Sequence, residues 1–496
     1  MALRIPVLAT SFLCLFAVSD ADAQLPVVDV SKPTPVTVSV WDRQRMNTTQ
    51  WFSATPNAAV YGHVDSLLRI ALQQRLKRID WAAEIAQNSE LWLPGDAVSP
   101  VAAQGQLGLG GSYYSSNGNN RFPAAASFKE GWLRYHFRHD TDTLRVGRFE
   151  FADGTEMKPA DPQLQWLQAN RVSQRLIGSF GFSNGQRSLD GVELKVNRGQ
   201  WDVTAMGARA VQGVFNMNAN PELNTDVQYL AYSRFAANKK VLLRGFAIGY
   251  HDGRTGALKV DGRSQALRAA DHGNIRIGTY GASAIAAVPV SKSLTVDGLF
   301  WGVLQNGRWG VQEHRAGAIA LEGGVKFATV KSTPWLRGGY LRTSGDTNPN
   351  DATHGTYFQV LPTPRNYARF PFFNMMNSTE AFVQLMDKPT AKIDIRSDLH
   401  FLRMTSGKDL WYLGGGPFDR TSFGYTGRPA NGFTSFAKLY DVSVDYQLTK
   451  QVVLTAYYAH VWGGDVVRAI YPADTHAQFG FLEMNYRFSA PFARRH

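Results

Sequence analysis

The 496-residue sequence contains a single cysteine, Cys14, and no apolar run of about 18 residues beyond residue 23. A fold held together by disulfides is therefore excluded. A helical membrane protein is excluded too, because a membrane-spanning helix needs about 20 consecutive apolar residues. Helix-period patterns are scarce, whereas apolar and polar residues alternate along most of the chain. The chain is either a soluble β-protein or a membrane β-barrel.

The N-terminal segment has the pattern of a cleavable signal peptide. Arg4 precedes an apolar stretch from Ile5 to Val18, and Ala21-Asp22-Ala23 forms a small-x-small cleavage site. We therefore predict a signal peptide over residues 1–23; a buried N-terminal helix is the alternative. Its removal takes away one basic and two acidic residues, so the net charge rises from +12 to +13. The remaining chain contains no cysteine.

Two-residue alternation is clearest at 441–448, 393–401 and 482–488, where Val, Ile, Leu, Tyr and Phe interleave with Asp, Ser, Arg and His. In a soluble sandwich the polar set would face water, and in a membrane barrel it would face the lumen. Many of the segments reach about ten residues, whereas strands of globular proteins usually have about five or six. Their length favours the barrel.

The connections between these segments are of two kinds. Short turns such as Asn238-Lys239 and Thr449-Lys450 alternate with long inserts rich in Gly, Asn and Pro. The long inserts cover residues 93–125, 154–186, 343–378 and 405–435. This asymmetry is typical of outer-membrane barrels, which have short periplasmic turns and long extracellular loops. We predict an all-β, transmembrane antiparallel β-barrel of about eighteen strands; the segments at 36–41 and 379–386 are the shortest.

The chain divides into four predicted parts. Residues 1–23 are the signal peptide, and the Pro-rich stretch 24–35 is a periplasmic lead-in. The barrel occupies 36–488 and ends in an aromatic residue, Phe488, as is usual for a closing strand; residues 489–496 form a C-terminal tail. This organisation predicts a multi-pass β-barrel in the outer membrane of a Gram-negative bacterium.

Enzyme signatures are absent from the sequence: it contains no GxSxG, HExxH, P-loop or cysteine-based motif. His400 lies near Asp398 on a polar strand face, which resembles half of a catalytic dyad. We interpret the two residues as a polar pair in the lumen, and we predict no catalytic, cofactor or metal site. A barrel enzyme acting on lipid or polysaccharide is a third hypothesis, but it would need a Ser/His/acid group that the sequence does not supply.

Arginine recurs on the polar faces of the predicted strands. An unpaired arginine facing lipid would cost about 2–4 kcal/mol at the membrane midplane, so these side chains are expected to point into water. The predicted pore-lining set comprises Arg69, Arg134, Arg145, Arg148, Arg171, Arg175, Arg187, Asp190, Glu193, Arg276, Arg396 and Arg487. Guanidinium groups match carboxylates, so such a lumen would favour anions. Salt-bridge ladders that brace the wall are the alternative, and an external basic surface could bind lipopolysaccharide phosphates.

Two blocks of the sequence resemble the alginate export porin family. The first has LRVGRF at 144–149, RVSQRLIG at 171–178 and QRSLDGV at 186–192; the second has DLHFLR at 398–403, DLWY at 409–412 and VWGGD at 461–465. The resemblance implies an eighteen-stranded outer-membrane barrel whose arginine-lined constriction passes polyuronate. It carries over to Arg148, Arg171, Arg175, Arg187 and Asp190. Phe149 stands where the family often has Gln.

The leading functional prediction is a passive pore that exports an anionic exopolysaccharide, alginate or a similar polyuronate, and export itself rests on the resemblance. The alternative is an uptake porin for small anions or oligosaccharides. The expected partners are an anionic polysaccharide or oligosaccharide, outer-membrane lipid and lipopolysaccharide, and periplasmic polysaccharide synthesis or export proteins. A monomer is expected, and nucleic-acid binding is implausible behind an export signal.

Overall fold

The computed structural model describes residues 33–53, 60–363 and 367–492. The predicted signal peptide lies outside the described residues, as does most of the predicted lead-in. The strands are β1 (Thr37–Gln50), β2 (Val60–Leu76), β3 (Ile79–Leu91), β4 (Ala124–His136), β5 (Thr143–Phe149), β6 (Leu189–Asn197), β7 (Trp201–Val211), β8 (Glu222–Phe235), β9 (Val241–Asp252), β10 (Ile275–Pro289), β11 (Leu294–Trp309), β12 (Gln312–Phe327), β13 (Trp335–Thr343), β14 (Thr353–His354), β15 (Ser378–Thr390), β16 (Ile393–Met404), β17 (Leu410–Gly414), β18 (Tyr425–Pro429), β19 (Ser435–Gln447), β20 (Val452–Gly463) and β21 (His476–Pro491).

Helices are few and short. They are α1 (Leu109–Ser116), α2 (Pro162–Leu167) with a π-helical turn at Gln168–Val172, α3 (Gln265–Ala270) and α4 (Asp465–Ile470). Among the described residues, none of the helices has the length and apolarity needed to cross a membrane.

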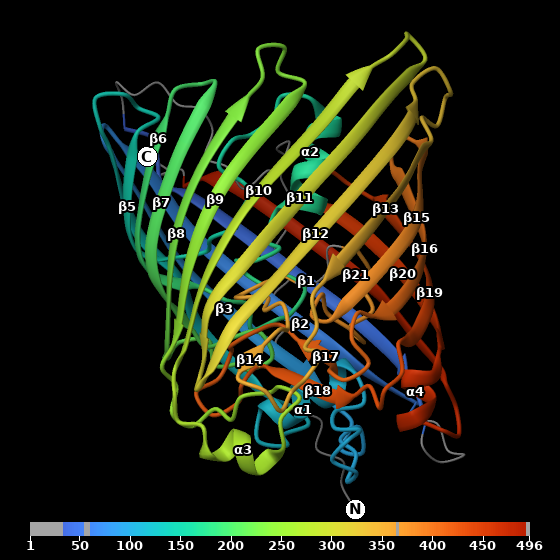
Figure 1. The fold of residues 1–496 in the computed structure, drawn as a ribbon. Helices are drawn as coiled ribbons and strands as arrows, with labels where there is room; N and C mark the ends of the chain where they lie inside the picture. Colours follow the sequence, from blue (N-terminus) through green and yellow to red (C-terminus); the bar gives the residue numbers. More distant parts are fainter. Residues whose placement is uncertain (1–32, 54–59, 364–366, 493–496) are drawn as a thin grey trace, which may run out of the picture.

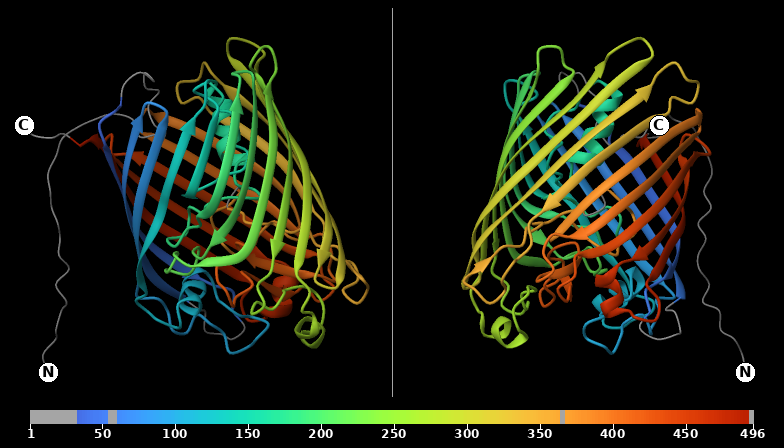
Figure 2. Two further views of the ribbon diagram at one scale, coloured as in Figure 1. Left: turned by 90° about the vertical axis from the view of Figure 1, so that its left-hand side faces the viewer. Right: turned by 45° about the vertical axis from the view of Figure 1, so that its right-hand side comes forward.

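Eighteen long strands form a closed antiparallel barrel, as predicted (Figure 1). Each pairs with its neighbour along the chain, β13 pairs with β15, and β16 pairs with β19. The first strand pairs with both β2 and β21, so the sheet has no free edge. Three further strands lie in loops: β14 adds two residues beside β12, and β17 and β18 form a separate hairpin. Figure 2 shows the strands running strongly tilted around the barrel.

The strand pattern in the sequence marks the positions well but misjudges some ends. The short pattern at 36–41 is only the beginning of β1, which continues to Gln50. The pattern at 379–386 likewise belongs to the longer β15. The last strand continues to Pro491, three residues beyond Phe488.

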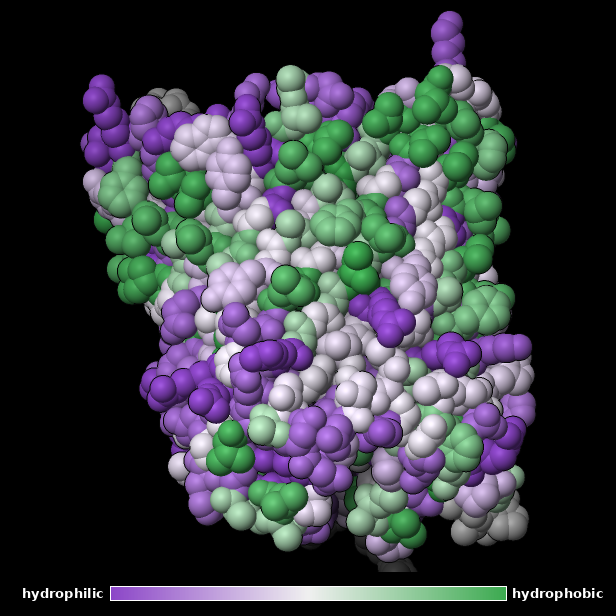
Figure 3. Space-filling view, viewed as in Figure 1, coloured by the Kyte–Doolittle hydropathy of each residue, from purple (hydrophilic) through white to green (hydrophobic). Residues whose placement is uncertain are grey.

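Side chains alternate between the two faces of the barrel wall as the strand period requires. In β19, Tyr440 and Tyr446 are exposed on the outside, whereas Asp441 and Ser443 are buried on the inside. Figure 3 shows apolar residues over the upper part of the barrel and hydrophilic residues over the lower part of the same face. The apolar part is the surface suited to lipid.

Short connections and long connections lie at opposite ends of the barrel, which we call the short-turn end and the long-loop end. The turns at 77–78, 198–200, 391–392 and 448–451 lie at the first. The segments 92–123, 150–188, 344–377 and 405–434 begin and finish at the second, where α1, α3, α4 and the β17–β18 hairpin lie (Figure 1). This asymmetry agrees with the predicted pattern of turns and loops.

Loop 150–188 turns into the barrel. Its helix α2 begins at Pro162, and the Asp161 side chain accepts hydrogen bonds from the backbone N–H groups of Gln163 and Leu164. The helix lies inside the barrel near the short-turn end (Figure 1). The second carboxylate oxygen of Asp161 lies 2.8 Å from the Lys240 Nζ, which belongs to the turn between β8 and β9. The loop therefore crosses the length of the lumen.

The loops also give the long-loop half of the barrel an apolar interior. Trp51, Phe52, Phe370, Phe372 and Trp411 are all buried there and contact one another edge-on or tilted, with ring centroids between 5.2 and 6.1 Å apart. Buried aromatic residues of this kind make a hydrophobic core between loop and wall. The lumen is therefore partly filled by the protein itself.

Candidate functional site: a partly filled, arginine-rich lumen

Six residues of the predicted set point into the barrel. Arg69 shows the geometry: its own side chain is buried, whereas its neighbours Leu68 and Ile70 are 36% and 37% exposed on the outer face. The same alternation places the other five on the inner face; the six are Arg69, Arg134, Arg145, Glu193, Arg396 and Arg487. Their position supports the prediction that they line the lumen.

A cavity of about 920 Å³ lies at the short-turn end, against β1 and β19–β21. Its wall carries more positive than negative charge: the basic residues are Arg43, Arg45, Arg369, Lys450 and Arg487, and the acidic residues are Asp445 and Glu483. Trp41 also lines it, and the guanidinium of Arg487 lies 4.7 Å from the centroid of that ring. The cavity thus joins a basic surface to an aromatic one.

A second cavity of about 430 Å³ lies against β4–β7 and is bordered by Gln174, which also borders the first. Its charges are balanced: Arg134, Arg145 and Lys195 face Glu150, Glu156 and Glu193. Arg145 forms an ion pair with Glu193, and its guanidinium lies 4.1 Å from the centroid of the buried Phe149 ring. The buried Phe149 ring therefore packs against the guanidinium of Arg145, which lines this cavity.

Several lumen arginines are paired, as the salt-bridge alternative anticipated. Arg69 bonds to Glu84 and lies 3.0 Å from Glu150, and Arg396 lies 2.5 Å from Asp398. Arg369 differs: within the described residues, no carboxylate lies in salt-bridge contact with its guanidinium, whose central carbon lies 5.9 Å from the centroid of the Tyr457 ring. Unpaired charge in the lumen is available to attract an anion.

Three predicted pore residues face the outside instead. Arg148 and Asp190 form a salt bridge of 2.7 Å on the face that also carries Val146 and Val192, which are 48% and 42% exposed. Arg276 is likewise exposed on the outer face, while Ile275 and Ile277 on either side of it are buried inside. All three lie near the long-loop end, where the outer face is polar. The prediction that they line the pore is therefore wrong.

Arg171 and Arg175 belong to loop 150–188 and lie inside the barrel without contact with open lumen, because both are fully buried between this loop and the wall. Their guanidinium groups lie 3.3 and 3.4 Å from the carboxylate of Glu322, which also receives Arg337 at 2.9 Å. The two arginines thus anchor the loop to β12 and β13. Their assignment as pore lining is corrected to a structural role.

Arg187 is also buried, and it connects three loops. Its guanidinium donates to five backbone carbonyl oxygens, those of Gly178, Leu361, Pro362, Gly415 and Pro417, at 2.7 to 3.4 Å. Burial lowers the pKa of Arg187 to about 10, so the side chain stays charged at neutral pH. It ties loop 150–188 to loops 344–377 and 405–434 and does not line the pore.

Three lumen residues escaped the sequence analysis. Arg43 and Arg45 continue the alternation that begins at Trp41, so a longer predicted first strand would have placed them inside. Arg45 lies 3.1 Å from Asp65 and 2.6 Å from Glu483, and Arg43 donates to loop carbonyls. Arg369 lies in loop 344–377, where no strand pattern marks it. Its position depends on how the loop folds.

The closed barrel, the apolar outer band and the charged lumen define a channel of the outer-membrane β-barrel porin class. The chain belongs to the alginate export family, whose model matches residues 37–481. Acinetobacter baumannii OccAB4 has a similar structure, with a TM-score of 0.56 and 10% identity, over 93% of this chain and 100% of that one. Pseudomonas aeruginosa OpdK, solved with vanillate, gives 0.55 and 8% over 92% and 99%. A comparison with curated protein sequences gives no match.

Proposed function

We propose that this porin passes carboxylated saccharides, and that its substrate is an anionic polysaccharide of the alginate type, moving outward. The observation that carries the proposal is the cavity at the short-turn end, where five basic side chains face two acidic ones. A wall with excess positive charge raises the local concentration of anions and lowers the barrier to their entry. The chain needs no energy source of its own, because polymer synthesis or a gradient supplies the drive.

The chemistry of the cavity suits a uronate chain. Guanidinium groups bind carboxylates through paired hydrogen bonds, and they remain charged at every physiological pH. Trp41 lies among Arg43, Arg69 and Arg487, whose guanidinium carbons are 4.7 to 5.6 Å from its ring. An aromatic face beside basic groups offers a surface for the apolar face of a sugar ring while its carboxylate meets arginine. Ion pairs such as Arg45–Glu483 limit how tightly a polyanion is held.

Passage of the polymer and the side from which it enters are the two parts of the proposal to test. Proteoliposomes loaded with fluorescent polyuronate and carrying the porin in one orientation should release polymer, and neutral dextran of equal length should stay inside. Single-channel recordings should show block by polyuronate added to the short-turn side. A channel that prefers K⁺ over Cl⁻, or that polyuronate does not block, would refute the proposal.

The second candidate is an uptake channel for small carboxylates. It is favoured by loops 150–188 and 344–377, which pack into the lumen and leave limited space for a polymer. The similar barrel of OpdK was solved with vanillate, a small carboxylate. Liposome swelling with a uronate monomer, trimer and decamer separates the two candidates. A sharp cut-off after the monomer supports uptake, and passage of the decamer supports polymer export.

The proposal extends to the membrane surroundings and to the export of the chain itself. Arg209, Arg276 and His251 lie on the outer wall near the long-loop end, together with acidic residues, and we assign this surface to lipopolysaccharide head groups. Residues 1–23 are proposed to act as the signal peptide. Periplasmic proteins of polysaccharide synthesis or export are the proposed partners, with the porin itself a monomer.

A further inference from the structure

A group of polar side chains is buried on the inner wall where β15, β16 and β19 meet. It comprises Glu380, Gln384, Asp398, His400 and Asp441, which we call the His400 cluster. All five are between 0% and 3% exposed. Strand pairing sets Gln384 opposite Asp398 and Asp398 opposite Asp441, so the side chains project from adjacent strands into one place.

The ring of His400 is held in one orientation. Its Nδ1 lies 2.7 Å from Oε1 of Glu380, so Nδ1 carries the proton that is donated to that carboxylate. The opposite nitrogen, Nε2, then carries a free lone pair and lies 4.0 Å from Oδ1 of Asp441. One ligand atom from each of Asp398, His400 and Asp441 lies within 4.8 Å of the others. A carboxylate behind the histidine is the usual arrangement at a metal-binding imidazole.

Several atoms of the cluster have no hydrogen-bond partner among the described residues although they are buried. They are Nε2 of His400, Oδ1 of Asp398, Oε2 of Glu380 and both amide atoms of Gln384. A buried polar atom without a partner costs about 1–3 kcal/mol, so such a concentration calls for a ligand. Arg396 binds the other oxygen of Asp398, Oδ2, at 2.5 Å and leaves Oδ1 free.

We propose that the His400 cluster binds one divalent transition-metal ion of the zinc class. Nε2 of His400, Oδ1 of Asp398 and Oδ1 of Asp441 are the ligands, and Gln384 lies beside them. Three carboxylates share the cluster with one bonded arginine, Arg396, so a dication reduces the excess negative charge. One imidazole with carboxylate oxygens suits Zn²⁺ better than Mg²⁺ or Ca²⁺, which prefer oxygen ligands alone.

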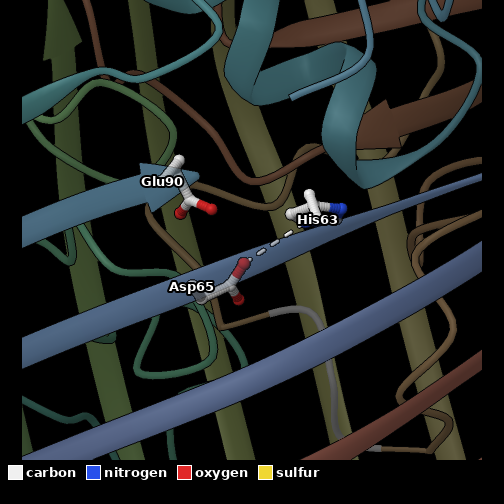
Figure 4. A group of neighbouring side chains, drawn as sticks. All are labelled: His63, Asp65 and Glu90. Atoms are coloured by element: carbon white, nitrogen blue, oxygen red, sulfur yellow. Dashed lines mark ion pairs between the residues drawn. The ribbon is translucent and has the colours of Figure 1, made fainter. Parts of the chain in front are cut away.

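A second buried group contains the same residue types and provides the contrast. His63, Asp65 and Glu90 lie on β2 and β3, with Asp65 between the other two (Figure 4). Asp65 already receives Arg45 at 3.1 Å, and the nitrogen of His63 lies 3.2 Å from Asp65 itself. Two carboxylates here lie near two arginines, Arg45 and Arg43, whereas three carboxylates share one bonded arginine in the His400 cluster. No separate carboxylate among the described residues orients His63, so we assign no metal to this group.

The competing arrangement is an imidazolium at His400 that bridges Glu380 and Asp441 without a metal. To separate the two, the full chain is purified in detergent, stripped with EDTA and titrated with Zn²⁺ by calorimetry. Co²⁺ is used as an optical probe, because its absorption reports nitrogen and oxygen ligands directly. We expect one Zn²⁺ per chain, and we expect Ca²⁺ and Mg²⁺ at equal concentration not to compete. A wild-type chain that binds no Zn²⁺ overturns the proposal.

Variants locate the ion. His400→Gln should abolish Zn²⁺ binding, whereas His63→Gln, the matched change in the second group, should leave it intact. Glu380→Gln removes only the orienting carboxylate and should weaken binding about 10- to 100-fold with the stoichiometry unchanged. This variant serves if His400→Gln fails to fold, as judged by heat-modifiable migration in SDS gels. Unchanged binding in both His400→Gln and Glu380→Gln, or loss in His63→Gln alone, overturns the proposal.

Discussion

Strand β10 changes character along its length. Near the long-loop end Arg276 is on its outer face and the buried Ile277 on its inner face. Toward the short-turn end Tyr280, which is 55% exposed, is on the outer face and the buried Ser283 on the inner face. The polarity of the wall is thus reversed between the long-loop end and the middle of this strand. The end is built like a water-soluble protein, with an apolar inner face, and the middle is built like a membrane channel; nearer the short-turn end, Ile285 and Ala287 are again buried on the inner face in the apolar cluster that includes α2.

The medium on each side of the wall explains the reversal. In the short-turn half the outer face meets lipid and the inner face meets cavities lined by charged residues. In the long-loop half the outer face is polar, and the inner face packs against loops that carry many buried aromatic residues. Alternation determines which residues share a face of the wall. The lipid, water or packed loop that each face contacts determines which face is apolar.

The largest effect is expected from opening the apolar interior of the long-loop half. Trp411 is 1% exposed, packs against Phe52 and Phe436, and donates a hydrogen bond to the carbonyl of Phe372 at 2.6 Å. Trp411→Ala should cost about 3–5 kcal/mol of loop packing. The loops should become sensitive to protease, while the barrel keeps its resistance to SDS. Trp462→Ala, at an outer-face residue that is 44% exposed, is the control. Loops as resistant as those of the wild type would contradict a soluble-like core.

The next effect concerns the outer face and compares two positions on one strand. Leu230 and Gln228 lie on the outer face of β8, and Leu230 is 53% exposed. Leu230→Arg should destabilise folding into vesicles more than Gln228→Arg, because the cost of a lipid-facing arginine falls from about 2–4 kcal/mol at the membrane midplane to about 0–1 kcal/mol near the interface, and Gln228 lies two residues closer to the polar long-loop end. Urea titration of folding into lipid vesicles measures both. Equal losses would place the lipid boundary elsewhere.

This difference along the wall explains why the local pattern does not predict the orientation of Arg276. Arg69 and Arg276 each stand between two aliphatic residues, and the pattern predicts the same inward orientation for both. The structure places Arg69 inside and Arg276 outside, because distant loops fill the lumen beside Ile275 and Ile277 and no such core lies beside Leu68 and Ile70. Local alternation carries no information about packing with a segment far away in the chain.

The barrel itself could be predicted because strand length, alternation and turn asymmetry are local properties. The loop residues could not. Arg171 and Arg175 are basic residues in a segment without strand period, and only their packing against Glu322 and Arg337 makes them structural. Arg369 also lies in a loop without strand period, but the fold of that loop places it on the wall of the cavity at the short-turn end. Charge content predicted an arginine-rich interior, and tertiary folding decided which arginines reach the lumen.

A smaller effect is expected from removing single charges on the two faces. A unit charge about 7 Å from the ion path in water-like surroundings contributes about 0.6 kcal/mol, a factor of about three. Arg369→Gln should disfavour Cl⁻ and favour K⁺ by about this factor each, and should therefore lower the Cl⁻/K⁺ permeability ratio by up to about eightfold. Arg148→Gln, on the outer wall, should leave it unchanged. Reversal potentials in planar bilayers under a KCl gradient measure the ratio. A change in Arg148→Gln equal to that in Arg369→Gln would contradict the assignment of faces.

The smallest effect tests the attachment of loop 344–377 to the wall in the long-loop half. His354 is fully buried, its ring stacks on Trp309 with centroids 4.0 Å apart, and its Nδ1 lies 2.9 Å from Nδ1 of His314. Burial lowers the pKa of His354 well below its usual value. The unfolded loop therefore takes up a proton more readily than the folded one. Loop stability should fall as the pH drops below about 6.5, the ordinary pKa of histidine, and should be constant above it.

A single cysteine can report this opening, because the only natural one, Cys14, lies in the predicted signal peptide. Val360→Cys places a thiol at a fully buried position of the same loop. Its maleimide labelling, measured relative to a free thiol at each pH, should rise between pH 7 and pH 5. Adding His354→Phe keeps an aromatic ring beside Trp309 but removes one of the two facing imidazoles, so the rise should become smaller; the buried His314 accounts for what is left. If the rise is unchanged in that variant, the loop is released by another group and His354 is only a packing residue.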